Sequence, residues 1–335
     1  MKLHRLVVLG LVLAAAPLVA QEIKTPKIEP TDFKDPGPVA YKFAKGKAES
    51  YTAETVTKSI VGVQVAGQEM TITTTGTTRT RTVYTPLNEE TPTKVEIVTE
   101  HIRMKQNVDN PMMPAEVTVE DKKVKVTSGG QVLYDSESGT ESPMAAQFAQ
   151  AAQVIGKKVV LTVDADGRAG KKLEGDPDAV KRMRYMAEQG IFPIIWKGQS
   201  GLKVGDTWEV EVELSALESM ELKQPVKFKS TYKVLGGALV DGVYCVEIET
   251  VITGKAANLE ATTEQSGMQM QLKIPSMVFS MKGRAYYDPA QNRVIFADQK
   301  GTAEFEASGD VGGAGNLDLK VNVDTRNVLR YNVPW

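Results

Sequence analysis

Histidine and cysteine are almost absent from this sequence, which has two histidines, His4 and His101, and one cysteine, Cys245, among 335 residues. A single cysteine cannot form a disulfide within the chain. A serine–histidine–aspartate triad outside the first twenty residues would have to use His101. Because zinc is held chiefly by cysteine and histidine, we expect no metal site and no cofactor.

Neither sign of charge dominates the sequence. It contains 40 Lys and Arg residues against 42 Asp and Glu residues, a net charge of −2. Proteins that bind nucleic acids carry a basic patch or stripe, which this balance does not predict. We therefore expect no nucleic-acid partner.

The first twenty residues have the order of a secretory signal peptide. Lys2 and Arg5 give a positive start, residues 6–16 are apolar, and Ala20 precedes the polar Gln21. The apolar run is shorter than the roughly 20 residues of a membrane span. We expect cleavage after residue 20, export to the periplasm or the medium, and no integral membrane segment in the mature chain.

Beyond the signal peptide, residues 21–40 contain four prolines among charged residues, which predicts an extended tether. From residue 41 onward, apolar and polar residues alternate as in half-buried strands. We predict a first β unit over 41–140, a helix–hairpin–helix connection over 141–200 and a second β unit over 201–335. The expected fold is all-β, with two similar antiparallel β-meander units forming curved sheets or an open barrel or sandwich, and two short helices between them.

The clearest alternation predicts a strand with an apolar face made of Trp208, Val210, Val212 and Leu214. Residues 226–234 repeat the pattern, and the two strands are expected to share one core. The Asp241-Gly242 pair predicts the next hairpin turn. Further strands are predicted at 244–252, 268–274, 294–296, 303–305 and 317–323.

Glu209, Glu211 and Glu213 invite comparison with glycosidases, in which paired carboxylates perform acid–base chemistry. In an antiparallel hairpin, however, Lys229 can face Glu211 and Lys227 can face Glu213. Because all these positions are odd-numbered, any even-sum register places the glutamates and lysines on one face. Such cross-strand pairs keep a sheet face hydrated, whereas a catalytic acid sits in an apolar pocket. We interpret the glutamates as a solvated charge ladder.

Two helices are predicted in the connection, at Ser142–Gly156 and Asp176–Gly190, each with a capping residue at its start and a glycine at its end. Between them, residues 159–163 and the Asp166-Gly167 turn indicate a β-hairpin. The turn also resembles the start of a calcium loop. Leu173 stands where that loop requires a glutamate, so no calcium site is expected.

Three short similarities between the two halves suggest a duplicated β unit. They pair Lys94–Ile97 with Cys245–Ile248, Leu133–Asp135 with Tyr286–Asp288, and Tyr51 with Trp208, in the same order and at nearly constant offset. We therefore predict that Tyr134 and Tyr287 occupy equivalent positions. Each should end a strand at a turn that begins with an aspartate.

These motifs permit a comparison with a known family. The segment Leu202–Trp208, the two Tyr-Asp turns and the Val163–Gly167 hairpin resemble a family of exported, two-repeat, all-β bacterial proteins of unknown function. The resemblance covers nearly the whole mature chain and implies export and an all-β fold. It transfers no activity and no residue role. Leu18 and the threonine-rich strand 71–82 depart from the family's features.

We expect His101 and Cys245 to have structural rather than catalytic roles. The repeat places His101 where the second half has Ile252, so we expect a partly buried histidine on the strand face that carries Val95 and Ile97. Cys245 is expected to be a small buried hydrophobe. The alternative for Cys245 is an intermolecular disulfide, which requires an exposed thiol.

One apolar cluster is the candidate ligand-binding site: Met268, Met270, Met277, Phe279 and Met281. Flexible methionines line adaptable ligand surfaces, and they equally fill cores, so both interpretations stay open. As a ligand site, the cluster would lie on a curved sheet that presents an apolar concave face to lipid.

The last residues alternate through Leu329, Tyr331, Val333 and Trp335, a pattern seen in the final strand of outer-membrane β-barrels. Against this, Pro334 removes a donor from the strand ladder, and aromatic residues make up only 6% of the chain.

The expected function is that of a non-enzymatic, exported cell-envelope protein with a binding or structural role, which presents an apolar sheet face to lipid or to an envelope partner. One alternative is a hydrolase with a site of scattered Asp and Glu residues, and another is an outer-membrane β-barrel. An enzyme should show convergent carboxylates in a cleft, whereas a binding protein should show an apolar concavity.

Overall fold

The computed structural model describes residues 23–65, 67–111, 114–138, 152–189, 191–217, 220–265, 268–310 and 316–335. These residues form one antiparallel sheet of 15 strands, so the all-β prediction is confirmed. The expected signal peptide lies outside them. In the part of the chain that is described, no helix is long and apolar enough to span a membrane.

Most neighbouring strands in the sheet are also neighbours in sequence. The strands are β1 (Ile28–Thr31), β2 (Glu49–Val65), β3 (Gln68–Pro86), β4 (Thr93–Asp109), β5 (Ala115–Glu120), β6 (Lys123–Ser128), β7 (Gln131–Asp135), β8 (Lys158–Val163), β9 (Glu174–Gly175), β10 (Thr207–Leu217), β11 (Met220–Val240), β12 (Val243–Gln265), β13 (Met268–Asp288), β14 (Arg293–Asp310) and β15 (Asn316–Tyr331). Their order is β1-β11-β12-β13-β14-β15-β2-β3-β4-β5-β6-β7, with β10 beside β11 and β8 beside β4 and β9.

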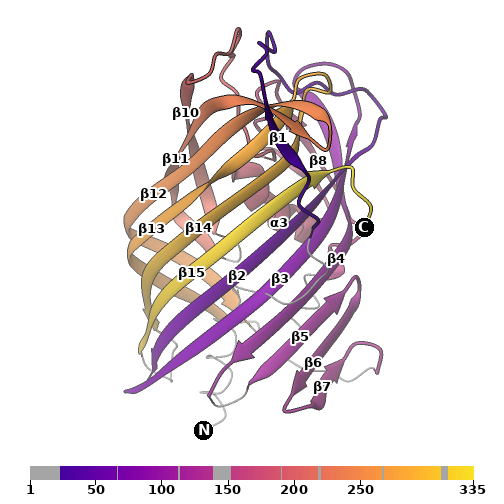
Figure 1. Ribbon diagram of the computed structural model, residues 1–335. Coiled ribbons are helices and arrows are strands. Elements are labelled where there is room, and N and C mark those ends of the chain that lie inside the picture. The colour runs from indigo at the N-terminus through magenta and orange to yellow at the C-terminus, as the bar shows by residue number, and fades with distance from the viewer. Residues whose placement is uncertain are drawn as a thin grey trace.

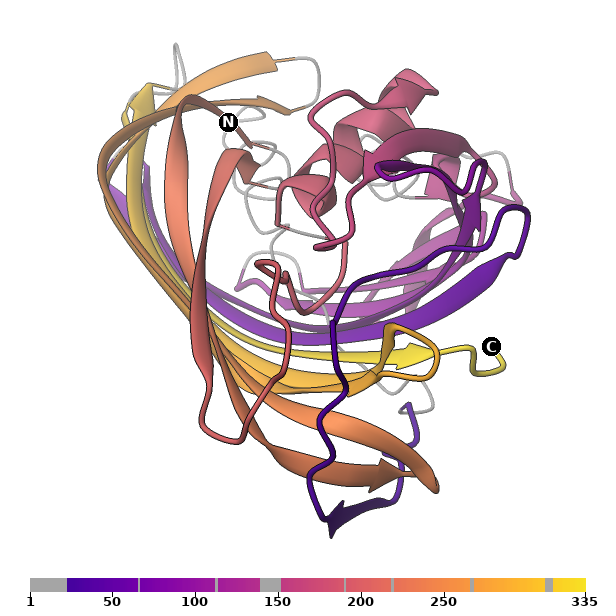
Figure 2. The ribbon, with the colours of Figure 1, turned by 90° about the horizontal axis from the view of Figure 1, so that it is seen from above.

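The sheet curves into an open trough (Figure 1). Seen from above, helix α3 (Pro177–Gln189) lies within the curve, and β1 lies outside it (Figure 2). We call these two sides the inner face and the outer face. The described strands do not close on themselves, because β1 and β10 lie at one margin and β7 and β9 at the other.

The hairpin of β10 and β11 has the predicted register, with Glu211 opposite Lys229 and Glu213 opposite Lys227. Lys227 Nζ lies 2.7 Å from Glu211 Oε1 and 3.8 Å from Glu213 Oε1, and all three side chains are exposed. The solvated charge ladder is therefore confirmed. The apolar residues that alternate with it are buried in the main core: Trp208, Val210, Val212, Val226, Phe228, Tyr232 and Val234.

A seam between β15 and β2 joins the two predicted β units into one sheet. It runs from Leu317 opposite Val65 to Tyr331 opposite Tyr51. The two units therefore share a sheet, and their boundaries and their duplication stay predictions.

The two Tyr-Asp turns agree with the prediction only in part. Tyr134 and Tyr287 each precede an aspartate that ends a strand, and each aspartate accepts a hydrogen bond from the amide two residues later, at 3.0 and 2.8 Å. Their places in the sheet differ, however. Tyr134 is half-buried on the marginal strand β7, whereas Tyr287 is fully buried on the interior strand β13. The two turns are thus confirmed, the two tyrosines differ in burial and in place in the sheet, and their equivalence stays a prediction.

The second predicted helix is confirmed as α3. Asp176 caps it, because its Oδ1 accepts hydrogen bonds from the backbone amides of Asp178 and Ala179, at 3.2 and 3.3 Å. The first predicted helix lies mostly outside the described residues. Its described end is helical at 152–153 and is followed by Gly156 with φ +78°. The predicted hairpin between the helices is confirmed: β8 leads into a turn that closes on Ala169.

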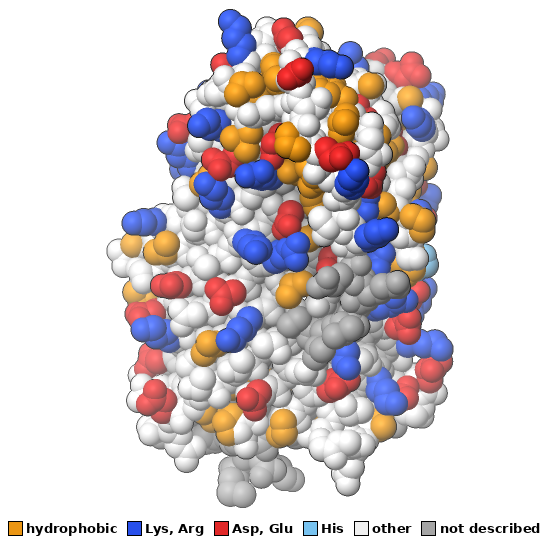
Figure 3. Space-filling model, viewed as in Figure 1, with side chains coloured by type: hydrophobic (Ala, Val, Ile, Leu, Met, Phe, Trp, Pro, Cys, Tyr) orange, Lys and Arg blue, Asp and Glu red, His pale blue; other side chains and the backbone are white. Residues whose placement is uncertain are grey.

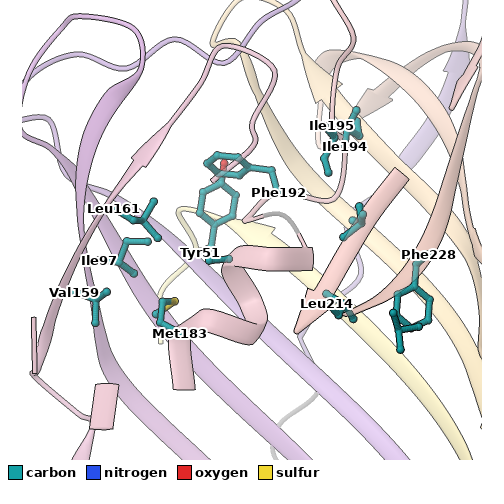
Figure 4. Packing of buried hydrophobic residues seen from close by; sticks show 14 of the residues in the cluster. Tyr51, Ile97, Val159, Leu161, Met183, Phe192, Ile194, Ile195, Leu214 and Phe228 are labelled. Carbon is teal, nitrogen blue, oxygen red and sulfur yellow. The ribbon is translucent and has the colours of Figure 1, made fainter. Parts of the chain in front are cut away.

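The main hydrophobic core lies on the inner face. Figure 4 shows Ile97 and Leu161 of the sheet on one side of Tyr51 and Phe192, with Met183 of α3 close by. Aromatic rings continue through this core along the irregular segment before β10. Phe192 stacks on Tyr41 with ring centroids 4.3 Å apart, and Trp196 lies 5.3 Å from Trp208 and 4.9 Å from Tyr287.

A smaller core lies on the outer face beneath the segment that carries β1. Cys245 is fully buried there with Ile23 and Phe296, so its interpretation as a small buried hydrophobe is confirmed. Burial raises the pKa of the Cys245 thiol to about 12.

His101 lies on the face opposite to the one predicted. A β-bulge shifts the register of β4 against β3, so that Thr99 pairs with Thr82 and His101 with Arg81. A bulge inserts one unpaired residue and reverses the alternation beyond it. Val95 and Ile97 stay in the inner core, whereas His101 is half-buried and stacks on Trp335 with ring centroids 5.2 Å apart.

Candidate ligand site on the inner face

All five predicted ligand residues lie on β13. Met268 and Met270 are at its start, where their backbones pair with Gln265 and Thr263 of β12. The side chains of these two methionines lie outside the described part of the structure, so the prediction for them is untested.

Met277, Phe279 and Met281 alternate along the inner face. A register shift between Lys273 and Ser276 on β13 changes which residues face inward, so that Ile274 before it and Met277 after it are both in the main core. Met277 is buried, and Phe279 and Met281 are half-buried. The structure thus divides the cluster into one core residue and two residues that remain partly accessible.

Neighbouring strands add further apolar side chains beside Phe279 and Met281. We call the half-buried inner-face set the floor, and its members are Ile252, Phe279, Met281, Ala303, Phe305 and Val323. Ile252 lies opposite Met281, and Phe279 opposite Ala303, which in turn lies opposite Val323. The floor therefore crosses four adjacent strands, from β12 to β15.

Small residues lie between the large ones. Gly254 lies opposite Phe279, and Gly301 lies opposite Met281. The ring of Phe228 covers Gly254 and meets the Phe279 ring edge-on, with ring centroids 5.5 Å apart. Because Gly254 has no side chain, the Phe228 ring has room to lie over it and to contact Phe279.

Two buried hydroxyl groups continue the row of Phe279, Ala303 and Val323. Val323 lies opposite Ser59 of β2, and Ser59 lies opposite Thr74 of β3. Both side chains are 0% exposed, and neither hydroxyl has a hydrogen-bond partner in the described structure. A buried hydroxyl without a partner costs about 1–3 kcal/mol, and because both side chains are fully covered, the accessible part of the row ends at Val323.

The surrounding inner face is polar but uncharged. On the next row, Gln299 Nε2 donates to Thr250 Oγ1 at 2.8 Å, and Asn327 lies beside Gln299 on β15. Asn327 Nδ2 also points at Met281 Sδ, 4.0 Å away. The inner-face positions of these rows from β12 to β3 hold no Asp, Glu, Lys or Arg.

The buried tyrosines of the aromatic part of the inner core stay neutral at ordinary pH. Burial raises the pKa of Tyr41 and of Tyr51 well above the usual tyrosine range. Burial also raises the pKa of Tyr287 to about 12. In the described part of the chain, no group of three or more His, Cys, Asp or Glu side chains could hold a metal ion.

Sequence reasoning found Phe279 and Met281 but missed Ile252, Phe305 and Val323. All three lie on strands that the sequence predicts. The alternation along those strands shows that the three side chains point inward. The sequence did not single out Ser59 or Thr74, because the pattern of a strand does not show whether its hydroxyl groups have hydrogen-bond partners.

No protein-family model matches the chain, and no curated protein matches it. Lipovitellin, in a structure titled for its lipid–protein interactions, shares 13% identity at a TM-score of 0.43, over 87% of this chain and 26% of that chain. OccK11 (OpdR) of Pseudomonas aeruginosa shares 8% at a TM-score of 0.20, over 88% and 100%. A DUF1329 family protein of Desulfovibrio piger shares 11% at a TM-score of 0.14, over 84% and 87%.

The chain thus spans about a quarter of the length of the lipovitellin chain that it resembles. At these values the likeness concerns the fold alone, and it carries no ligand, activity or family membership over to this chain.

Proposed function

We propose that the protein is a non-enzymatic, exported binding protein of the cell envelope that holds a lipid on the floor of its trough. The supporting observation is the floor itself, a partly accessible apolar surface that crosses four strands. Export rests on the signal-peptide pattern of the first twenty residues.

The row through Phe279, Ala303 and Val323 matches the acyl chain of a lipid. An acyl chain on these three residues would remove apolar surface from water, at about 25 cal/mol per Å². Ser59 and Thr74 continue the row but are fully covered, so they are not contacts of the proposed ligand.

The absence of charged side chains from the described rows around the floor favours binding over hydrolysis. A hydrolase of scattered acids needs at least one carboxylate aimed at the bound ligand. The rows around the floor present threonine, serine, asparagine and glutamine instead. These groups orient a ligand and do not exchange protons with it at neutral pH.

Native mass spectrometry of the protein purified from its own envelope tests the proposal. We expect an added mass of one lipid per chain, which disappears after extraction with organic solvent. Ala303→Leu should fill the floor between Phe279 and Val323 and lower the lipid-bound fraction at least about fivefold.

Two further variants keep this test specific. Glu304→Leu changes the adjacent, outward-facing residue of β14 and should leave the lipid bound. Ser59→Ala should leave the lipid bound and keep the free protein at least as stable, because it deletes an unpaired hydroxyl that is fully covered. A wild-type protein that carries no lipid and takes up no fluorescent fatty acid would contradict the proposal.

A further inference from the structure

The outer face has a hollow of about 480 Å³ that crosses β13, β14, β15 and β2 at mid-length. Figure 3 shows Lys and Arg side chains gathered at mid-height on this face. The residues of the hollow that matter here are Lys58, Lys282, Lys300, Thr302, Asp324 and Arg326. The sheet itself separates the hollow from the floor, so it concerns a second ligand and stands apart from the proposed lipid.

Three cations occupy directly paired positions on three adjacent strands. Lys282 lies opposite Lys300, and Lys300 lies opposite Arg326. Directly opposed side chains of a sheet have Cβ atoms about 4.5–5.5 Å apart, and like charges at that distance destabilise the pairing. A counter-ion beside the row would relieve this repulsion.

The two outer cations of the row are held in place by acids, and the central one is not. Lys282 Nζ lies 2.8 Å from Glu249, and Arg326 makes two hydrogen bonds to Asp298, at 3.0 and 2.8 Å. Lys300 makes no ion pair within the described residues. Its ammonium group is therefore available between two oriented cations.

The second row of the hollow contains groups that attract an anion and one group that repels it. Thr302 lies opposite Asp324, which lies opposite Lys58. Lys58 adds an exposed cation without an ion pair in the described structure, and the Thr302 hydroxyl adds a donor. Asp324 is the one acid among the six residues and weakens the attraction for an anion at this side.

We propose that the hollow binds the phosphate group of an anionic ligand, with Lys300 and Lys58 as its direct cationic contacts. Arg326 and Lys282 orient the site and raise its potential. Phosphate fits because it offers several strong acceptor oxygens to converging cations and a hydroxyl. The chemistry is shared by a free phosphate compound and by a phospholipid headgroup, and the experiment separates them.

Titration calorimetry of the whole chain with inorganic pyrophosphate at low ionic strength tests the free-ligand form. Cosedimentation with phosphatidylglycerol vesicles, compared with phosphatidylcholine vesicles, tests the headgroup form. Lys300→Gln should weaken whichever binding is found by at least about tenfold, and added salt should weaken it further. Asp324→Asn should tighten it by about threefold.

Lys320→Gln is the matched control, since Lys320 is an exposed lysine on the same face of β15 with Glu306 as its acidic neighbour at 4.0 Å. It should change binding by less than about twofold. Lys300→Gln should also raise the unfolding midpoint, because it removes like-charge repulsion, which a purely structural lysine would not do. Absence of binding to both pyrophosphate and phosphatidylglycerol, or equal loss in Lys300→Gln and Lys320→Gln, would overturn the proposal.

Discussion

The ring of Phe228 lies directly on Gly254, its cross-strand partner on β12, and leaves no room there for a side chain. The same ring meets Phe279 of β13 edge-on. The glycine therefore allows two aromatic rings from strands that are not neighbours to touch across it, and it sets the position of Phe279 on the floor.

Gly254→Ala should destabilise the protein by about 1–3 kcal/mol, because the new methyl group would overlap the Phe228 ring. Gly62→Ala is the control, since a Cβ there would have its nearest neighbour, Lys320 Cβ, at 3.8 Å, an ordinary contact. Its free energy of unfolding should change by less than about 0.5 kcal/mol. Urea denaturation measures both, and equal losses would show that the ring does not limit the space at Gly254.

Val212→Asp should cost about 3 kcal/mol or more, because the new carboxylate would be buried among apolar residues without a partner. Val212 is 8% exposed in the main core. Glu211→Gln, one residue earlier, removes only an exposed ion pair with Lys227 and should cost under about 1 kcal/mol. If both variants have the same urea midpoint, the assignment of inner and outer faces of β10 is wrong.

Stability should decrease in strong alkali through the buried tyrosines. A tyrosine in the unfolded chain has a pKa near 10, whereas burial raises the pKa of Tyr287 to about 12 and that of Tyr41 well above the usual range. The folded state thus binds the phenolic protons more tightly. Their contribution to stability is complete below pH 10 and is lost as the pH rises towards the folded-state values.

Circular dichroism followed together with tyrosinate absorbance between pH 9 and 12.5 checks the alkaline transition. We expect ionisation of the buried tyrosines to coincide with loss of the sheet signal. Tyrosines that all titrate near pH 10 in a folded protein would contradict the burial of this aromatic group.

Trp335→Ala should destabilise the protein by about 1–2 kcal/mol, because the indole lies among three side chains on the outer face. Its ring centroid is 5.1 Å from the Arg79 guanidinium and 5.5 Å from that of Arg103, and His101 stacks on it. Trp335→Phe should recover part of the loss. Hydrogen exchange of β3 and β4 measures the effect locally, and unchanged protection in Trp335→Ala would show that this contact contributes nothing.

The sequence was sufficient to predict strands and hairpins where alternation and turn residues agreed. Period-two patterning predicted the shared core of β10 and β11, and the parity of the charged residues predicted that they lie together on the other face. The Asp241-Gly242 turn was predicted as well, and both of its residues have positive φ, at 49° and 85°, as a tight hairpin turn requires.

The positions of bulges and the packing of irregular segments could not be predicted from alternation. The bulge in β4 reversed the face of His101, and nothing in its local sequence signals an extra residue. Phe192 and Trp196 lie in an irregular segment without a period, yet they fill the aromatic part of the inner core. The floor was found in part, because β13 was predicted as a strand but its neighbours in space were not known.

The seam between β15 and β2 also has a kinetic consequence. Tyr51 and Tyr331 lie near opposite ends of the chain and pair within this seam. Contacts between residues so far apart in sequence form slowly, since a very long loop must close before they give any stability. A chain that crosses a membrane from its amino terminus would deliver β2 first and β15 last. Until β15 arrives, β2 and β14 would both expose unpaired strand edges, and the incomplete sheet would depend on protection from aggregation at that stage.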